Sequence, residues 1–274
     1  MFKIYTTGQE FLDENINIIR NDPLGTTFFE KNAQAIAHCN TNDYAIRIET
    51  NGQLLLAIHV GDYPIVLYGS EHCADELADV IANNQLIFNK TIGPYELSNA
   101  FLTAYEQRVG GSHEVHLFMD VMYCDKVNPC DTSSVQRAVA KDVADIAHIV
   151  VDFTYEALGE KPEFSQVYED VSERINSYAL LRLDGAIVSV ASGYDEDNGL
   201  CRLANVYTLP EHRNKGYSRK VVTYLTEQAI LGGKIPYLHV DQHNPVSNHL
   251  YSSIGYVYGK SRYEIIYVPV CIED

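Results

Sequence analysis

A short basic segment contains the residues of this sequence with the clearest capacity for chemistry. Residues 206–209 are mainly apolar, Pro210 and Glu211 make a turn, and a basic loop with Gly216 precedes a helix-like stretch. The free N–H groups of a first helical turn and the helix dipole favour an anion, and a glycine allows close approach to the backbone. Four of the 20 Lys and Arg side chains fall within eight residues here, at Arg213, Lys215, Arg219 and Lys220. The pattern indicates a phosphate site, although an ordinary strand-to-helix turn with a solvated basic face would use the same residue types.

Two motifs in this half of the chain resemble those of a known enzyme family. The spacing Arg213-x-x-Gly216-x-Ser218 resembles the pyrophosphate loop of GNAT acetyltransferases, in which Arg or Gln is followed by Gly and then by Gly or Ala. Ser218 departs from that pattern but is small, so the backbone cradle is kept. Residues 244–256 resemble the family's Asn-x-x-Ala-x-x-Leu-Tyr-x-x-x-Gly-Phe motif. The resemblance covers residues 135–270, and its Asn-Pro-x-Ser-Asn form is similar to the FR47-like branch, whose members often carry a degenerate N-terminal half.

The resemblance implies that acetyl-CoA is the co-substrate and that its pyrophosphate binds the basic loop. It implies that residues 206–208 pair with the pantetheine and that Tyr251 protonates the departing thiolate, as a phenol held against the sulfur can do. Tyr251 is also one of 20 tyrosines and could be a packing residue, and Asn244 could be a helix cap before Pro245. The implied CoA-binding residues are Val206, Tyr207, Thr208, Arg213, Asn214, Lys215, Gly216, Tyr217, Ser218, Arg219 and Asn244.

Fewer residues indicate where the acceptor and its base lie. In the family the strand before the basic loop floors the acceptor cleft, so Arg202 and Asn205 are candidates for acceptor contacts or plain strand-surface residues. An attacking amine must lose a proton, and five carboxylates are candidates for the base, each equally consistent with a solvated surface acid. These are Glu156, Glu160, Asp195, Glu196 and Asp241. His239 and His243 fit no triad or metal pattern and are interpreted as neighbours of the cofactor strand.

Apolar periodicity and turn residues predict the elements that position the loop. Residues 126–134 are predicted to be a linker, because Asn128-Pro129 and a polar run interrupt the apolar alternation. The pattern then predicts a strand at 135–139, helices at 141–158 and 162–176, strands at 178–183, 186–194 and 201–209, a helix at 217–231, a strand at 237–241, a helix at 246–253 and two closing strands within 256–270. The fold class is therefore α+β (mixed α/β), with a mostly antiparallel central sheet flanked by helices.

The N-terminal half repeats this order in a weaker form. Its predicted elements are a helical region at 11–38, strands at 44–49, 53–60 and 64–68, helices at 72–83 and 94–109, and a strand at 114–123. We therefore expect tandem GNAT-like domains, with 1–127 as a degenerate, non-catalytic domain and 133–274 as the catalytic one. The position that matches the basic loop carries Glu71, whose charge would repel a pyrophosphate.

Composition narrows the class of protein further. The 274 residues are 46% hydrophobic with a net charge of −17, which suits two globular domains, disfavours nucleic acid and favours cationic ligands such as amines. There is no stretch of about 18 apolar residues and no signal-peptide pattern, so we expect no membrane segment and a cytoplasmic location. The six cysteines form no Cys-x-x-Cys pair, which predicts reduced thiols, no disulfide and no metal.

These observations favour an acetyl-CoA-dependent N-acetyltransferase that acts on a primary amine of a small molecule or peptide by direct attack in a ternary complex. One alternative is a CoA or acyl-CoA binding protein without turnover, and another is a transferase of a longer acyl group. The presence of Tyr251 favours catalysis over binding without turnover, whereas the absence of a recognisable general base in the sequence weighs against catalysis. A homodimer stays open at this point.

Overall fold

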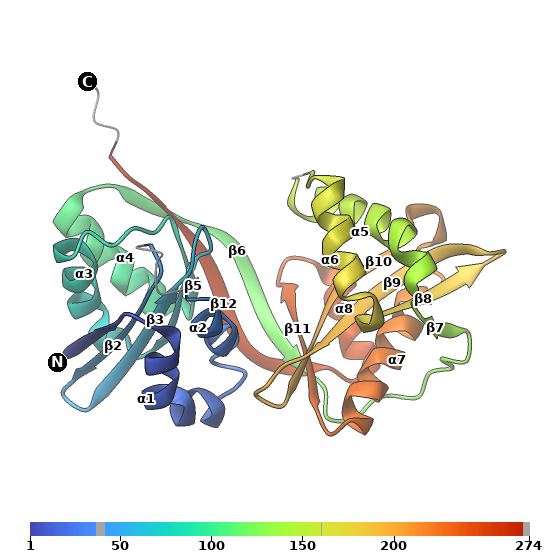
Figure 1. The fold of residues 1–274 in the computed structure, drawn as a ribbon, viewed down its shortest axis with the longest axis horizontal. Coiled ribbons are helices and arrows are strands. Elements are labelled where there is room, and N and C mark those ends of the chain that lie inside the picture. Colours follow the sequence, from blue (N-terminus) through green and yellow to red (C-terminus); the bar gives the residue numbers. More distant parts are fainter. Residues whose placement is uncertain (37–41, 160, 271–274) are drawn as a thin grey trace. The chain divides into compact units, whose positions relative to one another are not determined.

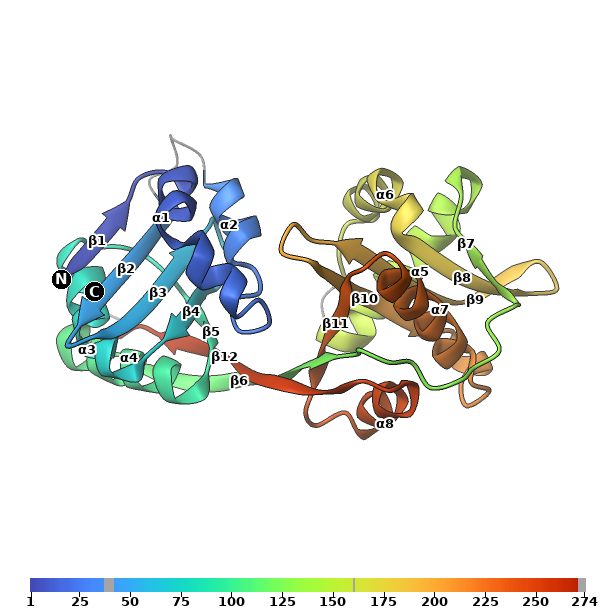
Figure 2. The ribbon, with the colours of Figure 1, turned by 90° about the horizontal axis from the view of Figure 1, so that it is seen from below.

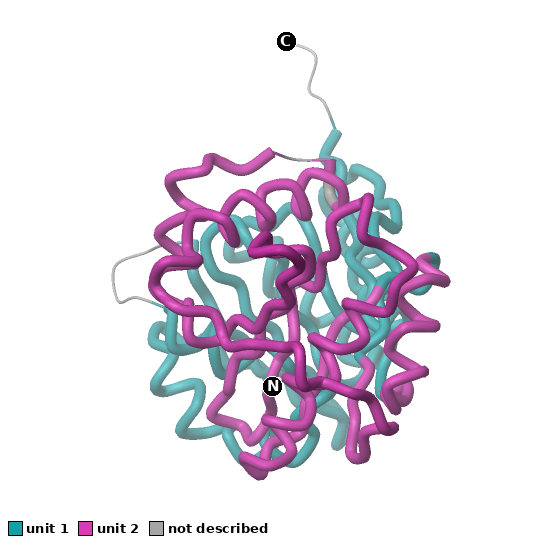
Figure 3. Tube along the Cα trace, turned by 90° about the vertical axis from the view of Figure 1, so that its right-hand side faces the viewer, with its two compact units in different colours: residues 1–121, 241–243, 259–274 teal, residues 122–240, 244–258 magenta. Residues whose placement is uncertain are grey.

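The computed structural model describes residues 1–36, 42–159 and 161–270, which form two compact units. The first unit comprises Met1–Val121, Asp241–His243 and Gly259–Asp274, and the second comprises Met122–Val240 and Asn244–Tyr258 (Figure 3). These units differ from the expected ranges 1–127 and 133–274 mainly because the C-terminal strand lies in the first unit. The assignment of one domain as catalytic and the other as non-catalytic stays a prediction.

The first unit is a mostly antiparallel sheet flanked by helices (Figure 1). Its strand order is β1-β2-β3-β4-β5-β12-β6, with β4 and β5 parallel. The strands are β1 Phe2–Tyr5, β2 Tyr44–Thr50, β3 Gln53–His59, β4 Ile65–Gly69, β5 Lys90–Gly93, β6 Ser112–Tyr123 and β12 Val257–Val268. The helices are α1 Gly8–Asn21, α2 Phe29–Ala35, α3 Ala74–Asn83 and α4 Tyr95–Val109.

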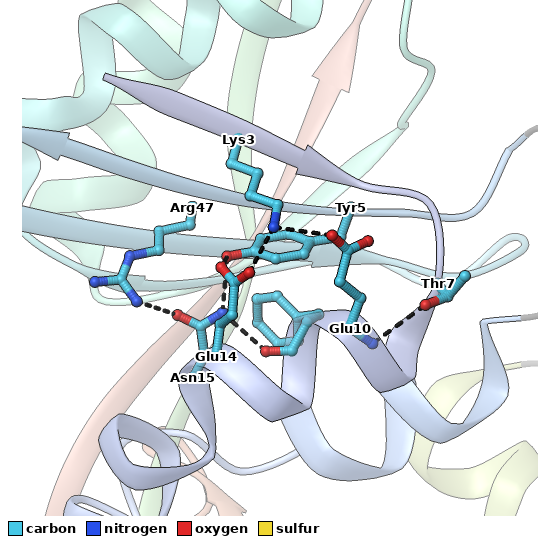
Figure 4. Close-up of polar contacts among 8 residues, drawn as sticks. Lys3, Tyr5, Thr7, Glu10, Glu14, Asn15 and Arg47 are labelled. Atoms are coloured by element: carbon cyan, nitrogen blue, oxygen red, sulfur yellow. Dashed lines mark hydrogen bonds and ion pairs between the residues drawn. The ribbon is translucent and has the colours of Figure 1, made fainter.

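A polar cluster holds α1 against β1 and β2 (Figure 4). Thr7 caps the helix by accepting from the N–H of Glu10 at 3.1 Å. The fully buried Asn15 donates to the hydroxyl of Tyr5 at 3.2 Å and accepts from Arg47 at 2.8 Å. Because every polar atom of this buried amide side chain has a partner, the cluster fixes the position of α1 without leaving an unsatisfied group.

The second unit contains all the loop and helix residues singled out in the sequence. Its strands follow the order β11-β10-β9-β8-β7, and all pairs are antiparallel except β10 with β11. The strands are β7 Val135–Arg137, β8 Tyr178–Leu183, β9 Ala186–Asp195, β10 Leu200–Thr208 and β11 Ile235–Asp241. The helices are α5 Val143–Leu158, α6 Phe164–Glu173, α7 Tyr217–Leu231 and α8 Pro245–Ile254 (Figure 2).

Alternate side chains of this sheet supply two cores on its opposite faces. Leu180 packs in a cluster with residues of α5 and α6, whereas its neighbour Leu181 packs in a cluster with residues of α7 and α8. On α7 the buried Val221, Leu225 and Ala229 recur every four residues, so one stripe of that helix faces the sheet. The result is a three-layer unit that holds the first turn of α7 at the end of β10.

The mixed α/β class predicted from the sequence is confirmed, and so is the order of most elements. Both halves follow the same element order, β-α-α-β-β-β-α-β-α-β, when short 3-10 turns are set aside. Sequence reasoning missed two short strands, β1 and β5. The two closing strands expected within 256–270 are instead one strand, β12, which continues through the polar Ser261 and the buried Arg262. Its pairing with β5 runs from Tyr263 to Ile266.

Candidate functional site

The strands β10 and β11 pair for only part of their length. Their parallel register runs from Leu200 opposite Ile235 to Arg202 opposite Tyr237. Just beyond it, a β-bulge lies between Ala204 and Tyr207 and puts Asn205 at a φ of +52°. The register with β9 resumes at Tyr207, so β10 stays in the sheet on that side while its other edge leaves β11. This divergence exposes the backbone edge of the last residues of β10 to a ligand.

The loop after β10 leads into a helix start suited to an anion. A 3-10 turn at Pro210–His212 is followed by Asn214 at a φ of +60° and Gly216 at +77°. Gly216 is the N-cap of α7, and no side chain caps that end. A Cβ added at Gly216 would meet no protein atom within 4 Å, so the space beside it is open. The first-turn N–H groups are thus unsatisfied donors beside open space, which fits a pyrophosphate.

Arg213 is held by an acid that the sequence placed 57 residues away. Its guanidinium donates to the Glu156 carboxylate at 2.7 Å and to the Thr208 carbonyl at 3.0 Å, and lies 5.2 Å from the ring centroid of Tyr207. The Tyr207 hydroxyl donates to the same Glu156 oxygen at 2.8 Å. The charge of Arg213 is therefore shared with a carboxylate, and its role toward CoA stays a prediction.

The other basic residues of the loop bind neutral groups. Lys215 donates to the Glu211 carbonyl at 3.1 Å, and Arg219 donates to the carbonyls of Pro129 and Ser253 at 3.4 Å. Neutral partners leave both positive charges uncompensated locally. The net positive charge beside Gly216 thus comes from Lys215 and Arg219.

Ser218, the residue that departs from the family pattern, is tied to the end of β10. Its hydroxyl lies 2.5 Å from that of Thr208, which in turn lies 2.8 Å from the hydroxyl of Ser189 on β9. This chain of hydroxyls directs the side chain toward the sheet, so the amides of the first turn of α7 stay accessible. A serine therefore replaces Gly or Ala here without filling the cradle.

Tyr251 and Asn244 belong to α8. Asn244 caps the helix by accepting from the N–H of Ser247 at 3.0 Å, with Pro245 next in the chain, so its capping role is realised. Tyr251 is 7% exposed and packs beside Tyr256, with ring centroids 5.9 Å apart. Burial raises the pKa of the Tyr251 phenol to about 12. The phenol is therefore uncharged at any physiological pH and available as a proton donor.

Asn205 gathers two tyrosines that sequence reasoning did not single out. Its amide nitrogen donates to the hydroxyl of Tyr178 at 2.8 Å and to that of Tyr194 at 3.2 Å. Arg202 stands directly opposite Tyr194 in the register, so the two share a face of the sheet. These residues come from three adjacent strands at the level of the bulge. In the sequence these tyrosines show only as polar aromatic residues on neighbouring strands. They can be recognised as a cluster only when the register of the strands is known.

The carboxylates proposed as bases in the described part of the second unit have different surroundings. Hydrogen bonds, first from Arg213 and then from Tyr207, hold the pKa of the Glu156 carboxyl below its usual value, which weakens it as a base. Asp195 stands opposite Cys201, whose side chain packs in the α7 core, so it lies on the other sheet face from Asn205. Glu160 lies outside the described residues.

The remaining two carboxylates have partners of their own. Glu196 accepts from the Tyr237 hydroxyl at 2.8 Å near the turn between β9 and β10. Asp241 belongs to the first compact unit and accepts from the N–H of His243 at 2.8 Å. His239 lies two residues after Tyr237 on β11, with ring centroids 5.6 Å apart. The roles of Glu196 and Asp241 as bases stay predictions.

The equivalent position in the first unit is built differently. The segment after β4 begins a 3-10 turn at Glu71–Cys73, and Ser70 caps it by accepting from the N–H of His72 at 3.3 Å. A Cβ on the preceding Gly69 would come 2.1 Å from the Leu54 carbonyl, so the backbone there is closely covered. A capped, acidic turn against covered backbone is a poor phosphate site.

The described residues contain neither a candidate metal site nor a membrane-spanning helix. Over residues 1–36, 42–159 and 161–270, no group of three or more His, Cys, Asp or Glu is arranged to hold a metal ion. Within those same ranges, no helix is long and apolar enough to cross a membrane.

Known structures share this fold along nearly the whole chain. A GNAT-family acetyltransferase from Colwellia psychrerythraea aligns with a TM-score of 0.61 and 13% identity, covering 98% of this chain and 100% of that one. A GCN5-related N-acetyltransferase from Sphaerobacter thermophilus aligns with a TM-score of 0.65 and 14% identity over 100% of this chain and 98% of that one. A Drosophila protein gives 0.62 and 13%, over 97% and 98%. At these identities the likeness defines the class of fold.

The family follows from the sequence of the second unit. Residues 143–256 match the model of the acetyltransferase (GNAT) family, which confirms the resemblance drawn from the two motifs. The match supports, in general terms, an acyl-CoA-dependent acetyltransferase. The FR47-like branch stays a prediction. A comparison with curated proteins found no match.

Proposed function

We propose that the protein is an N-acetyltransferase that moves the acetyl group of acetyl-CoA to a primary amine of a small molecule or peptide. The amine attacks directly while both substrates are bound. The observation that carries the proposal is the uncapped first turn of α7 behind Gly216, beside the point where β10 leaves β11. The unsatisfied N–H donors suit the pyrophosphate of acetyl-CoA. The exposed strand edge beside them suits the amide groups of the pantetheine.

Backbone and charge share the binding of the co-substrate. The N–H groups after Gly216 donate to the pyrophosphate, and Lys215 and Arg219 neutralise its charge. The edge of β10 at residues 206–208 pairs with the amides of the pantetheine. Arg213 fixes the end of β10 through Thr208 and Glu156, so it shapes the loop. When bound, acetyl-CoA supplies an activated thioester at the bulge.

Tyr251 is the proposed general acid. The departing sulfur gains negative charge as the C–S bond breaks, and a neutral phenol can donate a proton to it. Burial favours the neutral phenol over the phenolate, which keeps the proton in place until the sulfur needs it. A buried, protonated donor favours catalysis over CoA binding without turnover.

The acceptor amine is proposed to sit near Asn205 and Arg202. Asn205 is fixed by Tyr178 and Tyr194 and by its bulge conformation, so it offers a rigid polar surface where the thioester carbon would lie. The net charge of −17 on the whole chain attracts cationic amines toward the protein. Both features support an amine acceptor over an anionic one.

A screen of free-thiol release from acetyl-CoA tests the function. We expect at least one member of a panel of polyamines, amino acids, aromatic amines and peptides to give thiol release well above the rate with acetyl-CoA alone. Longer acyl-CoA thioesters tested against the same acceptor identify the acyl preference. If CoA binds but no amine in the panel stimulates release, the protein is a CoA-binding module.

The pH dependence of catalysis offers a second check on Tyr251. With a phenol pKa of about 12, the acid form is fully present through the usual assay range, whereas an unshifted tyrosine at about 10 would be half ionised at pH 10. We therefore expect the ratio of wild-type to Tyr251→Phe turnover to stay constant between about pH 6 and pH 10. A ratio that declines toward one above about pH 9 would contradict the buried acid.

A further inference from the structure

A cavity of about 420 Å³ lies within the second unit at the C-terminal end of α7. It is formed by the end of β7, the turn after α6, the β9–β10 region and the last residues of α7. The CoA loop is at the other end of this helix. The 15 residues of α7 span about 22 Å at 1.5 Å per residue, so the cavity is separate from the loop at Gly216.

Positive charge exceeds negative charge around this cavity. Arg137, Arg174 and Lys234 line it, and Asp195 is the one carboxylate among its described lining residues. Cys201 also lines it, and burial, with Asp195 beside the thiol, raises the pKa of that thiol to about 12. The thiol is therefore neutral. Three cations line the cavity against one lining carboxylate, and the charge of Glu196 also acts on the thiol from outside the lining.

Neutral groups hold the three cations in place. Arg137 donates to the Asn176 carbonyl at 3.4 Å, and Lys234 donates to the Glu196 carbonyl at 3.1 Å. The guanidinium of Arg174 lies 5.6 Å from the ring centroid of Tyr194. Arg182, Arg213 and Lys220 of the same unit instead form ion pairs with carboxylates. Contacts with carbonyls and a ring orient the cations without cancelling their charge.

The wall formed by the end of α7 does not oppose an anion strongly. A helix C-terminus carries partial negative charge on its last carbonyls. Here the carbonyls of Gln228 and Ala229 accept from the N–H groups of Gly232 and Lys234, at 3.0 and 2.9 Å. The helix end is therefore capped, and the cationic side chains dominate the field in the cavity.

We propose that this cavity is a second ligand site, which binds a small dianion through Arg137, Arg174 and Lys234. Three cations against one lining carboxylate leave an excess of positive charge for the ligand to neutralise. The volume suits a small metabolite, because ligand pockets begin at roughly 300 Å³. Carboxylate and phosphate oxygens share the chemistry that two guanidiniums and an ammonium recognise. The ring of Tyr194 links the site to Asn205, since Tyr194 carries Arg174 and accepts from Asn205 at 3.2 Å.

Calorimetry on the full chain with CoA present at saturation tests the site. Succinate serves as the dicarboxylate probe and glycerol 3-phosphate as the phosphate monoester probe, so the two arms distinguish the ligand types. We expect one of the two to bind, more weakly as salt rises. Arg137→Gln and, independently, Lys234→Gln should each lower its affinity about tenfold or more, as expected for loss of a charge-assisted hydrogen bond. Lys141→Gln, which removes an exposed cation outside the cavity, should leave the affinity unchanged.

Three results would overturn the proposal. The first is that neither probe binds the folded wild-type protein. The second is that the probe binds the two cavity variants as tightly as it binds Lys141→Gln. The third is that the probe binds the protein without CoA but not with CoA at saturation, which would assign the contact to the basic loop. Circular dichroism of each variant identifies any that fails to fold, and the other cavity variant then carries the comparison.

Discussion

Gly216→Glu is expected to abolish CoA binding while the protein stays folded. A Cβ at this position meets no protein atom within 4 Å, so the new side chain enters the space that the pyrophosphate is proposed to occupy. Its carboxylate would also sit at the N–H groups of the first turn of α7 and repel the phosphates. Steric exclusion and charge act in the same direction. Calorimetry with CoA at low salt measures the loss, and wild-type binding should weaken as salt rises.

Gly185→Glu is the matched control for this substitution. Gly185 has a φ of +87°, close to the +77° of Gly216, and its Cβ position is equally open. Both substitutions therefore carry the same charge and a similar backbone cost, about 1–2 kcal/mol for an L-residue in the left-handed region. Gly185 lies in the turn between β8 and β9, away from the loop. If both variants bind CoA as the wild type does, the loop has been assigned to the wrong ligand.

The local geometry of the loop after β10 could be predicted from the sequence because its signals are local. A strand, a Pro-Glu turn, a glycine and a helix follow one another within a few residues, so the chain itself brings them together. The positive φ of Gly216 and the uncapped start of α7 are consequences of that local pattern. The N-cap role of Asn244 is local as well, because cap and first turn are contiguous.

Features that depend on the register of distant strands could not be predicted in the same way. Glu156 and Arg213 are 57 residues apart in the sequence, and Asn205 and Tyr178 are 27 apart. Local residue spacing therefore predicts neither contact. The bulge in β10 is also set by its neighbours, since one extra residue must be absorbed between two registers with β9. The sequence analysis named Glu156, Arg213 and Asn205 as separate candidates and did not single out Tyr178.

The closing segment shows a different limit. Residues 256–270 contain the polar run Gly259-Lys260-Ser261-Arg262, which is typical of a turn between two strands. The chain instead stays extended as β12, and its residues Tyr263 to Ile266 pair with β5 of the first unit. A strand can carry a buried polar residue when neighbouring groups bind it, and Arg262 donates to the carbonyls of Leu24 and Gly25. A local sequence pattern cannot predict the pairing of β12 with β5, because the two strands are far apart in the sequence.

Tyr251→Phe is expected to lower turnover by roughly 10²- to 10⁴-fold, the usual effect of losing a general acid, with little change in the affinity for CoA. The phenol's proton matters only as the C–S bond breaks, so its loss raises the energy of the transition state alone. Ground-state contacts with CoA are proposed to come from the amides after Gly216 and from Lys215 and Arg219, none of which this substitution removes. Single-turnover rates, together with calorimetry, separate the two quantities.

Tyr256→Phe is the matched control for Tyr251→Phe. Tyr256 packs against Tyr251 in the same core and is 2% exposed, but its hydroxyl lies 2.8 Å from that of Thr226, a purely structural partner. Its loss should cost about 0.5–1.5 kcal/mol of folding stability and leave turnover nearly unchanged. Because both variants delete one buried tyrosine hydroxyl, a rate loss confined to Tyr251→Phe assigns the proton to that residue. Equal losses of rate and CoA affinity at Tyr251 would show that its hydroxyl instead holds α8 in position, and an unchanged rate would mean that water or another group protonates the thiolate.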